Sequence, residues 1–426
     1  MKTLIKSPER GHTVILTLVV SLVLGIVLLG IIKLTSTEGQ MTGRSQNWNA
    51  VLPIAEAGIE EALTHLKHSP SNRTENGWTY DSTLSKYTKT RTFKDGYYTV
   101  TISTNWDPVI ISRAGIRAPG QTNYTVFRTV RVGGTNQPLW TAAIEGLQCV
   151  SLTGNGITFN SYDSRDPNFS GPGGIYDPSR VKAGGDVACY GGVNSLDIGN
   201  ANIAGQIKTG PDATYSSGPN ASVGDLLWSK TSAGIEPGYY QQVDNTEWPN
   251  LTAPPGGVAP PPGTGPERGY QYVLGTGLYE AKQVNGDILV KGDATLVVTD
   301  RLQLNSAQIL PDAKLKLYVL APSASLKGIG NQRTDALHFI YFGLYNNVDV
   351  SMSGNSAFCG VLYAPNATLN LSGGGTDSVD FSGAIIAKCV KVNGHYSFHF
   401  DEAVRRFGSR GIFAASWDEL SPNSTL

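Results

Sequence analysis

The most pronounced pattern along the chain is an uninterrupted apolar run over residues 13–32, TVILTLVVSLVLGIVLLGII, which contains no charged side chain. A helix of this length covers about 30 Å, the thickness of the hydrocarbon core of a bilayer. The charged residues before the run are Lys2, Lys6, Glu9 and Arg10. Because basic residues favour the cytoplasmic side, the run predicts a single membrane span with a cytoplasmic N-terminus.

The apolar run continues without a break into a second pattern with helical spacing. In AEAGIEEALTHL, residues 55–66, a stripe recurs at intervals of three and four, while the glutamates fall largely outside it. The stripe consists of Ala55, Ile59, Ala62, Leu63 and Leu66. We therefore predict one long helix over residues 12–67, whose last part is buried on one face.

Alternating apolar and polar positions follow in residues 68–138. The strand candidates are residues 97–103, 109–112 and 124–132, with residues 69–86 as a loop. In the third candidate, Val126, Arg128, Val130 and Val132 share one face with Tyr124. A small antiparallel sheet that covers the helix stripe is the simplest arrangement.

From about residue 139 onward, short apolar runs recur between Gly, Asn and Asp. The clearest repeat aligns residues 358–373 with residues 381–394 at an offset of 23, placing Phe358 with Phe381 and Leu369 with Val392. Such a period is typical of a parallel β-solenoid, and an antiparallel β-sandwich is the alternative. The fold class expected is α+β, mostly β, with a solenoid-like domain over residues 139–210 and 271–400.

Two further segments interrupt and end this domain. Residues 211–270 are predicted to be an insertion, in which a Pro/Gly-rich tract follows an aromatic cluster of Trp228, Tyr239, Tyr240 and Trp248. That cluster could form a ligand patch or pin the insertion to the fold. Residues 401–426 are expected to cap the last turn of the solenoid.

Composition narrows the function. The chain has 426 residues, a formal net charge of −1 and 16% charged residues, so no nucleic-acid surface is expected. Its cysteines are Cys149, Cys189, Cys359 and Cys389, on the expected outer side where disulfides persist. We expect Cys149 to pair with Cys189, because both precede the insertion in similar strand contexts; buried free thiols are the alternative. No zinc pattern occurs, and no metal or cofactor is expected.

The N-terminal region resembles the type IV pilins, and most closely the PilX-like minor pilins. The likeness rests on the basic leader, Gly11, the uncharged run and the AEAGIEEAL segment. In that class a prepilin peptidase cuts after the Gly and methylates the new N-terminus, which implies a leader of residues 1–11 and a cut between Gly11 and His12. Two positions depart from the class: His12 replaces the usual aromatic residue, and Leu16 replaces the usual Glu.

The resemblance implies a structural subunit of a type IV pilus or a type II secretion-type pseudopilus. Its partners would be other pilin subunits, the prepilin peptidase and membrane lipid, with a surface glycan or another cell as the target of the outer domain. It would reside in the bacterial inner membrane before assembly and serve in priming or adhesion.

Two alternatives remain open. No hydrolase, nucleotide-binding or metalloprotease motif occurs, so an enzyme is not expected. A membrane-anchored polysaccharide enzyme would nevertheless draw on Asp300, Arg301, Asp377 and Asp380. The other alternative is a plain anchored adhesin without a pilus, which the departures at His12 and Leu16 motivate.

Overall fold

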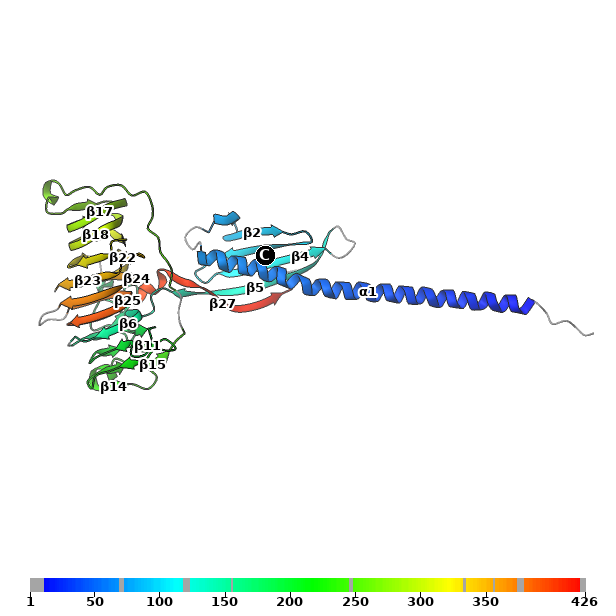
Figure 1. Cartoon of the computed structure of the whole chain (residues 1–426), viewed down its shortest axis with the longest axis horizontal. Coiled ribbons are helices and arrows are strands. Elements are labelled where there is room, and N and C mark those ends of the chain that lie inside the picture. The colour runs from blue at the N-terminus through cyan, green and yellow to red at the C-terminus, as the bar shows by residue number, and fades with distance from the viewer. Residues whose placement is uncertain are drawn as a thin grey trace, which may run out of the picture. The chain divides into compact units, whose positions relative to one another are not determined.

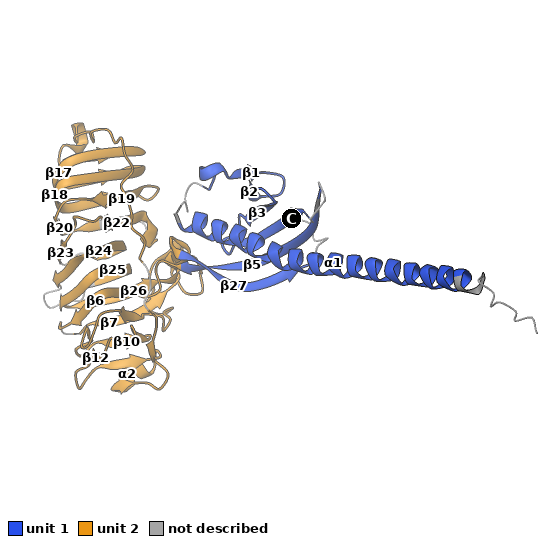
Figure 2. Ribbon diagram, turned by 45° about the vertical axis from the view of Figure 1, so that its right-hand side comes forward, with its two compact units in different colours: residues 1–137, 411–426 blue, residues 138–410 orange. Residues whose placement is uncertain are grey.

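The computed structural model describes residues 11–68, 73–117, 123–154, 156–244, 248–331, 335–354, 357–373 and 379–421. It divides into two compact units (Figure 2). Unit 1 consists of Met1–Gln137 and Gly411–Leu426, and unit 2 of Pro138–Arg410. The chain is mostly β with one long helix, as predicted. Unit 2 is therefore inserted, in sequence, ahead of the last segment of unit 1.

Helix α1 (Gly11–His68) is continuous through Pro53 and contains 58 residues, about 87 Å of helix. Its last third is buried on the predicted stripe: Ala55, Ile59, Ala62 and Leu66 are at most 6% exposed. Gly58 lies on the same side, and a Cβ there would clash with the Ser112 hydroxyl. The glycine therefore lets the helix approach the sheet closely.

The sheet of unit 1 is formed by six strands of the described residues, in the order β1-β2-β3-β4-β5-β27. Strands β1 to β5 pair as antiparallel neighbours. The strands are β1 (Thr79–Asp81), β2 (Lys86–Thr92), β3 (Gly96–Ser103), β4 (Val109–Arg117), β5 (Tyr124–Pro138) and β27 (Ser409–Leu420), with the 3₁₀ turn η1 (Glu75–Gly77) before β1. The three predicted strands are present, and β1, β2 and β27 are additional; β1 lies within residues 69–86, where the sequence predicts a loop.

Strand β27 overturns the prediction that residues 401–426 cap the outer domain. Residues 409–420 belong to the unit 1 sheet beside β5. An ion pair fastens the two strands, since Arg128 and Glu419 are 2.5 Å apart. Arg128 is the charged residue on the otherwise apolar face of β5, and Glu419 supplies the counter-charge that this position needs.

In unit 2 the strands of the main sheet pair in parallel, and Figure 1 shows them stacked in one column. The strands are β6 (Ile144–Leu152), β7 (Thr158–Tyr162), β8 (Val187–Cys189), β9 (Leu196–Asp197), β10 (Asn202–Ala204), β11 (Ile207–Thr209), β12 (Tyr215–Ser216), β13 (Ser222–Gly224), β14 (Gly234–Ile235), β15 (Tyr240–Gln242), β16 (Tyr272–Leu274), β17 (Gly277–Val290), β18 (Asp293–Ile309), β19 (Lys314–Val319), β20 (Ser323–Leu326), β21 (Ile329–Asn331), β22 (Phe339–Gly343), β23 (Asp349–Gly354), β24 (Phe358–Gly373), β25 (Val379–Gly394) and β26 (Tyr396–Asp401). Short helical turns are η2 (Pro172–Gly174), α2 (Trp228–Thr231), η3 (Gly265–Glu267), η4 (Ala336–His338) and η5 (Glu402–Arg406).

The chain enters and leaves this stack in its middle. Strand β6, early in the unit, pairs with β25, which comes late, so the two colours meet at mid-height in Figure 1. From β6 the chain proceeds to one end of the stack at β14 and β15. It then crosses to the other end at β16 and β17, and returns from there to β25.

This path corrects the predicted insertion over residues 211–270. Strands β12 to β15 continue the parallel pairing as far as residue 242. The Pro/Gly tract is not a free linker either, because the Val258 amide donates to the Leu278 carbonyl (3.0 Å) and the Val258 carbonyl accepts from the Glu280 amide (2.8 Å). Val258 thereby pairs with the edge of β17 at the end of the stack, where an exposed strand edge would otherwise invite association.

A row of phenylalanine rings fills the interior of successive turns. Ring centroids are 4.5 Å apart between Phe358 and Phe381, 5.5 Å between Phe381 and Phe398, and 4.8 Å between Phe398 and Phe159. These four side chains are at most 5% exposed. Each ring buries its faces only against the neighbouring turns, so the row ties together strands from both halves of unit 2.

The register that the 23-residue repeat predicts between β24 and β25 is correct in the first half of these strands and wrong in the second half. Phe358 pairs with Phe381 and Ala364 with Ala387, at the predicted offset, but Leu369 pairs with Val390 and not with Val392. The register shifts after Ala364 because three residues, 365–367, form the corner of one turn where only one residue forms the corner of the next.

The predicted disulfide between Cys149 and Cys189 is wrong. Cys149 is bonded to Cys389, with the Cα atoms 4.5 Å apart. These residues lie opposite each other in the paired strands β6 and β25. Cys189 is buried and outside any disulfide, and its thiol donates to the Ser195 carbonyl at 3.4 Å.

Candidate functional site

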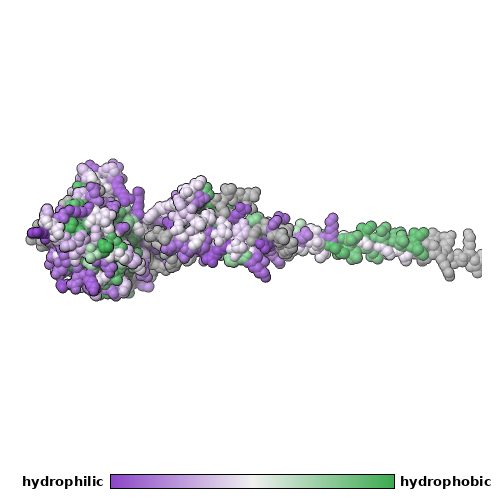
Figure 3. All heavy atoms as spheres, turned by 90° about the horizontal axis from the view of Figure 1, so that it is seen from above, coloured by the Kyte–Doolittle hydropathy of each residue, from purple (hydrophilic) through white to green (hydrophobic). Residues whose placement is uncertain are grey.

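The first candidate site is the apolar part of α1. Most residues from Val14 to Ile32 have large apolar side chains, and each of these large side chains belongs to a residue that is 48–68% exposed. Figure 3 shows this part of the helix as a hydrophobic surface. Among the described residues, α1 is the helix that is long enough and apolar enough to cross a membrane. The helix begins at Gly11, and the predicted leader before it lies outside the described residues.

The AEAGIEEAL segment also carries a polar anchor between α1 and the sheet. The Glu61 carboxylate accepts from Arg91 Nε (2.9 and 3.0 Å) and from Arg91 Nη2 (2.6 Å). Lys89 lies 2.8 Å away, and the Tyr98 hydroxyl donates to the same carboxylate. Two cations and a phenol from β2 and β3 therefore hold this glutamate in its ionised form.

The predicted aromatic patch does not exist as a single surface. Trp248 packs on the core of unit 2, where the Arg410 guanidinium lies 4.1 Å from its ring centroid. Tyr239 is half-buried. Tyr240 is 41% exposed and meets Tyr215, while Trp228 donates its indole N–H to the Gly234 carbonyl (3.2 Å). Trp248 thus holds its segment against the core of unit 2, which is the alternative to a ligand patch that the sequence leaves open.

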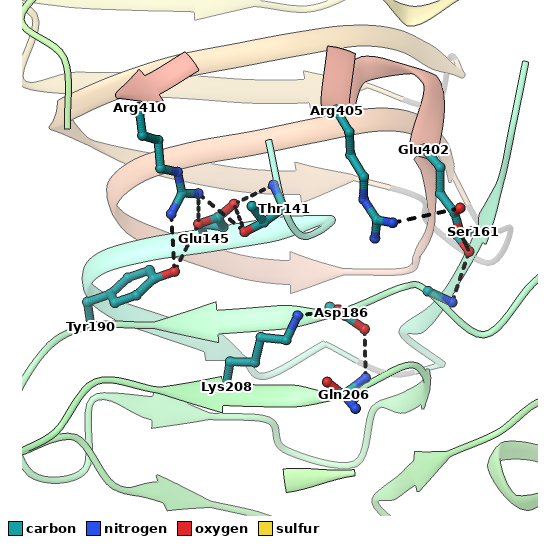
Figure 4. A network of polar contacts seen from close by, with 11 residues as sticks. Thr141, Glu145, Ser161, Asp186, Tyr190, Gln206, Lys208, Glu402, Arg405 and Arg410 are labelled. Atoms are coloured by element: carbon teal, nitrogen blue, oxygen red, sulfur yellow. Dashed lines mark hydrogen bonds and ion pairs between the residues drawn. The ribbon is translucent and has the colours of Figure 1, made fainter. Parts of the chain in front are cut away.

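The second candidate site is a polar pocket of about 350 Å³ in unit 2. Its functional lining combines two carboxylates, two cations, an amide and an aromatic ring: Asp186, Glu402, Lys182, Arg405, Gln206 and Tyr239. Figure 4 shows most of these side chains converging from separate turns of the stack. No signal in the sequence marks this site, because its members are scattered: Lys182 and Glu402 alone are 220 positions apart.

Both pocket carboxylates are paired with lysines. Glu402 Oε1 accepts from the Ser161 hydroxyl (2.8 Å), and its Oε2 pairs with Lys182. Asp186 accepts from the backbone amide of Gln206 (2.8 Å) and from Lys208 Nζ (2.6 Å). Each pocket carboxylate therefore accepts a charge-assisted hydrogen bond from a lysine and a second hydrogen bond from a neutral donor.

A fully buried ion pair lies beside the pocket (Figure 4). Arg410 and Glu145 contact each other with side chains 4% and 0% exposed. The carboxylate also accepts from the Thr141 amide and hydroxyl (both 2.9 Å). Burial, together with the Glu145 charge, raises the pKa of Tyr190 to about 12, so its hydroxyl donates to Glu145 (3.2 Å).

Asp401 is a buried acid close to the same corner. One carboxylate oxygen accepts from the amides of Ser164 (3.0 Å) and Ala403 (3.1 Å), while the other is buried and has no hydrogen-bond partner among the described residues. Burial raises the pKa of Asp401 from 3.8 to about 6. The nearby negative charge of Asp335 also raises this pKa, whereas the hydrogen bonds from Ser164 and Ala403 lower it. The native state therefore favours the protonated acid more strongly than the unfolded chain does.

This raised pKa predicts a pH-dependent stability. The contribution of Asp401 is fully present below pH 3.8 and is lost as the pH rises through about 6. We expect Asp401→Asn to stabilise unit 2 at pH 7, by on the order of 2 kcal/mol, because an asparagine oxygen can still accept both amide bonds. Urea unfolding at pH 4 and pH 7 checks this. The exposed Asp300→Asn serves as control, and an equal effect of Asp401→Asn at both pH values would contradict the assignment.

The carboxylates that the sequence suggests for catalysis do not form a pair in the described residues. Asp300 accepts from the neighbouring Thr299 hydroxyl (2.7 Å), and Asp380 lies 3.2 Å from His399 Nε2. Arg301 donates to Gln303 (3.0 Å). Asp377 lies outside the described residues. In the part of the chain that the structure describes, no group of three His, Cys, Asp or Glu side chains could hold a metal ion.

Comparisons with known proteins add little to this geometry. Residues 268–407 match the model of a family described as a domain of unknown function (DUF7305), which covers the returning half of unit 2. No curated protein was found that matches the chain. A solved structure, the competence-associated pilin ComZ from Thermus thermophilus, is similar over 88% of this chain and 98% of its own. Its TM-score of 0.28 and identity of 11% are too low for the likeness to carry an argument.

Proposed function

We propose that the chain is a pilin-like subunit that is stored in the bacterial inner membrane and enters a type IV pilus or a type II secretion-type filament. The division of α1 carries this proposal. Its first part is apolar and exposed, and its last part packs on the unit 1 sheet through the stripe of Ala55, Ile59, Ala62 and Leu66. An exposed apolar helix needs lipid or sister helices to remove it from water.

Processing of the leader tests this proposal. We expect a cut between Gly11 and His12, so that the mature chain starts at His12. N-terminal sequencing of the membrane-extracted protein measures the start, and Gly11→Val should leave the leader in place. Gly25→Ala is the matched control, since a Cβ at Gly25 meets no atom within 4 Å. A mature protein that starts at Met1 would exclude the processing step.

Assembly is tested separately. Filaments should be fewer, or should lose this subunit, in cells without the prepilin peptidase. A protein that reaches the surface unchanged without the peptidase would instead support the plain anchored adhesin that His12 and Leu16 motivate.

For unit 2 we propose a β-solenoid that displays a binding surface. The parallel register of its turns and the interior row of phenylalanine rings support this interpretation. Its role would be display and not catalysis. Glycoside hydrolysis needs one carboxyl group that donates a proton and a second that is ionised, whereas Asp186 and Glu402 are both paired with lysines.

A further inference from the structure

The polar pocket of unit 2 follows the direction in which the turns stack. Glu402 comes directly after β26, Asp186 precedes β8, Gln206 precedes β11 and Tyr239 precedes β15. Backbone bonds connect the last three of these corners in order, from the Val187 amide to the Gln206 carbonyl (2.9 Å) and from the Ile207 amide to the Tyr239 carbonyl (3.0 Å). Neighbouring strands are about 4.8 Å apart, so residues at successive corners of the stack are spaced by about that distance.

The pocket offers acceptors and donors in balance. Asp186 pairs with Lys208 and Glu402 with Lys182, and the two carboxylate side chains are 9% and 12% exposed, so they line the pocket as paired acceptors. Arg405 Nη1 lies 3.9 Å from Glu402, beyond hydrogen-bond distance. Its guanidinium carbon lies 5.1 Å from the Phe400 ring centroid, and the side chain as a whole is 38% exposed, which leaves donors for a ligand.

Two lining residues complete this chemistry. The Gln206 side chain is half-buried, and in the described part of the chain its amide group takes part in no hydrogen bond within the protein. Tyr239 is half-buried at the end of the row, where it packs against the core of unit 2 and its remaining surface lines the pocket. Hydroxyl-rich ligands with apolar ring faces need this combination of acceptors, donors and an aromatic surface.

We infer that this pocket binds a neutral saccharide, through its hydroxyl groups and one ring face. The lining contains two cations and two carboxylates, and Lys208 pairs with Asp186 from outside it, so the charges are nearly balanced and favour a neutral ligand over a strongly acidic one. A volume of about 350 Å³ is at the small end of ligand sites, which suits one or two sugar units of a longer chain. This inference rests on the display role proposed for unit 2.

Titration calorimetry of the detergent-solubilised full chain tests the inference. The probes are maltotetraose, cellotetraose and chitotetraose as neutral ligands, and tetragalacturonate as the acidic one. We expect saturable binding of a neutral probe. Gln206→Ala and Arg405→Gln should each weaken it roughly three- to tenfold, since each loses one or two hydrogen bonds.

Matched controls lie at the other half of the stack. Gln283→Ala and Arg301→Gln remove the same chemical groups from exposed positions of β17 and β18 and should leave the affinity unchanged. Binding of none of the probes, binding of the acidic probe alone, or equal binding by pocket and control variants would each overturn the inference. Release of new reducing ends from a bound probe would overturn the display role. None of these results depends on leader processing or filament assembly.

Discussion

Replacing both Cys149 and Cys389 by alanine is expected to lower the free energy of unfolding of unit 2 by about 4–5 kcal/mol. The disulfide joins residues that are 240 positions apart. A cross-link restricts the unfolded chain more strongly as the enclosed loop grows, which places this bond at the upper end of the usual range. Both residues are only half-buried, so alanine removes the link without opening a cavity in the core.

Urea unfolding of the oxidised protein and of the double variant measures this effect. Cys189→Ala is the control, because Cys189 is buried but closes no loop. We expect it to lower the urea midpoint much less than the double variant does. Equal midpoints for the double variant and the oxidised wild-type protein would show that the bond does not stabilise the native state.

The disulfide also shows what local sequence reasoning misses. Cys149 and Cys189 lie close in sequence and in similar strand contexts, which makes them the expected pair. The true partner, Cys389, is adjacent only because the chain enters the stack in its middle and returns there from the other end. No periodicity along the sequence records that path, so the pairing could not be deduced.

Short-range patterns are predicted well. The apolar run, the buried stripe on α1 and the strands around residues 97–132 follow from hydrophobic spacing, and the offset of 23 residues predicts the pairing of Phe358 with Phe381. The last strand escapes prediction because GIFAASWDEL continues directly from a 3₁₀ turn that resembles a cap. Its contact with β5 joins Glu419 to Arg128 across 291 positions, which only the fold reveals.

The polar pocket lies beyond sequence reasoning for the same reason. Asp186 stands at a corner, where an aspartate would pass as a turn former, and Gln206 carries no sequence signal of its own. Glu402 and Arg405 belong to a short 3₁₀ turn and reach the same pocket only through stacking of the turns. The aspartates that the sequence offers for an enzyme, Asp300 and Asp380 among them, lie outside this pocket.

Breaking the buried Glu145–Arg410 pair is the second large effect expected. Glu145→Ala leaves the guanidinium of Arg410 buried without its counter-charge, and such a loss costs about 3–5 kcal/mol. Arg410→Ala should cost a similar amount. It also removes the donors to the Leu139 carbonyl (2.8 and 3.0 Å) and the contact with the Trp248 ring.

A double variant that combines Glu145→Gln with Arg410→Met separates pairing from burial. The introduced glutamine can still accept from Thr141, and the introduced methionine can fill the space over Trp248, so replacing both charges should cost far less than removing one. Urea midpoints of the single variants Glu145→Gln and Arg410→Met and of their double variant give the coupling energy. The more exposed pair of Arg405 and Glu402 offers the control, since Arg405→Gln should cost less than about 1 kcal/mol.

The position of the pair explains why this coupling should be large. Arg410 is the last residue of unit 2, and it binds both Leu139 and Glu145, near the first residues of the unit. The pair therefore closes the stack at the point where the chain enters and leaves, and losing one charge there should loosen both connections at once. Additive losses in the double variant would contradict this, because they would mean that each side chain acts through its other contacts alone.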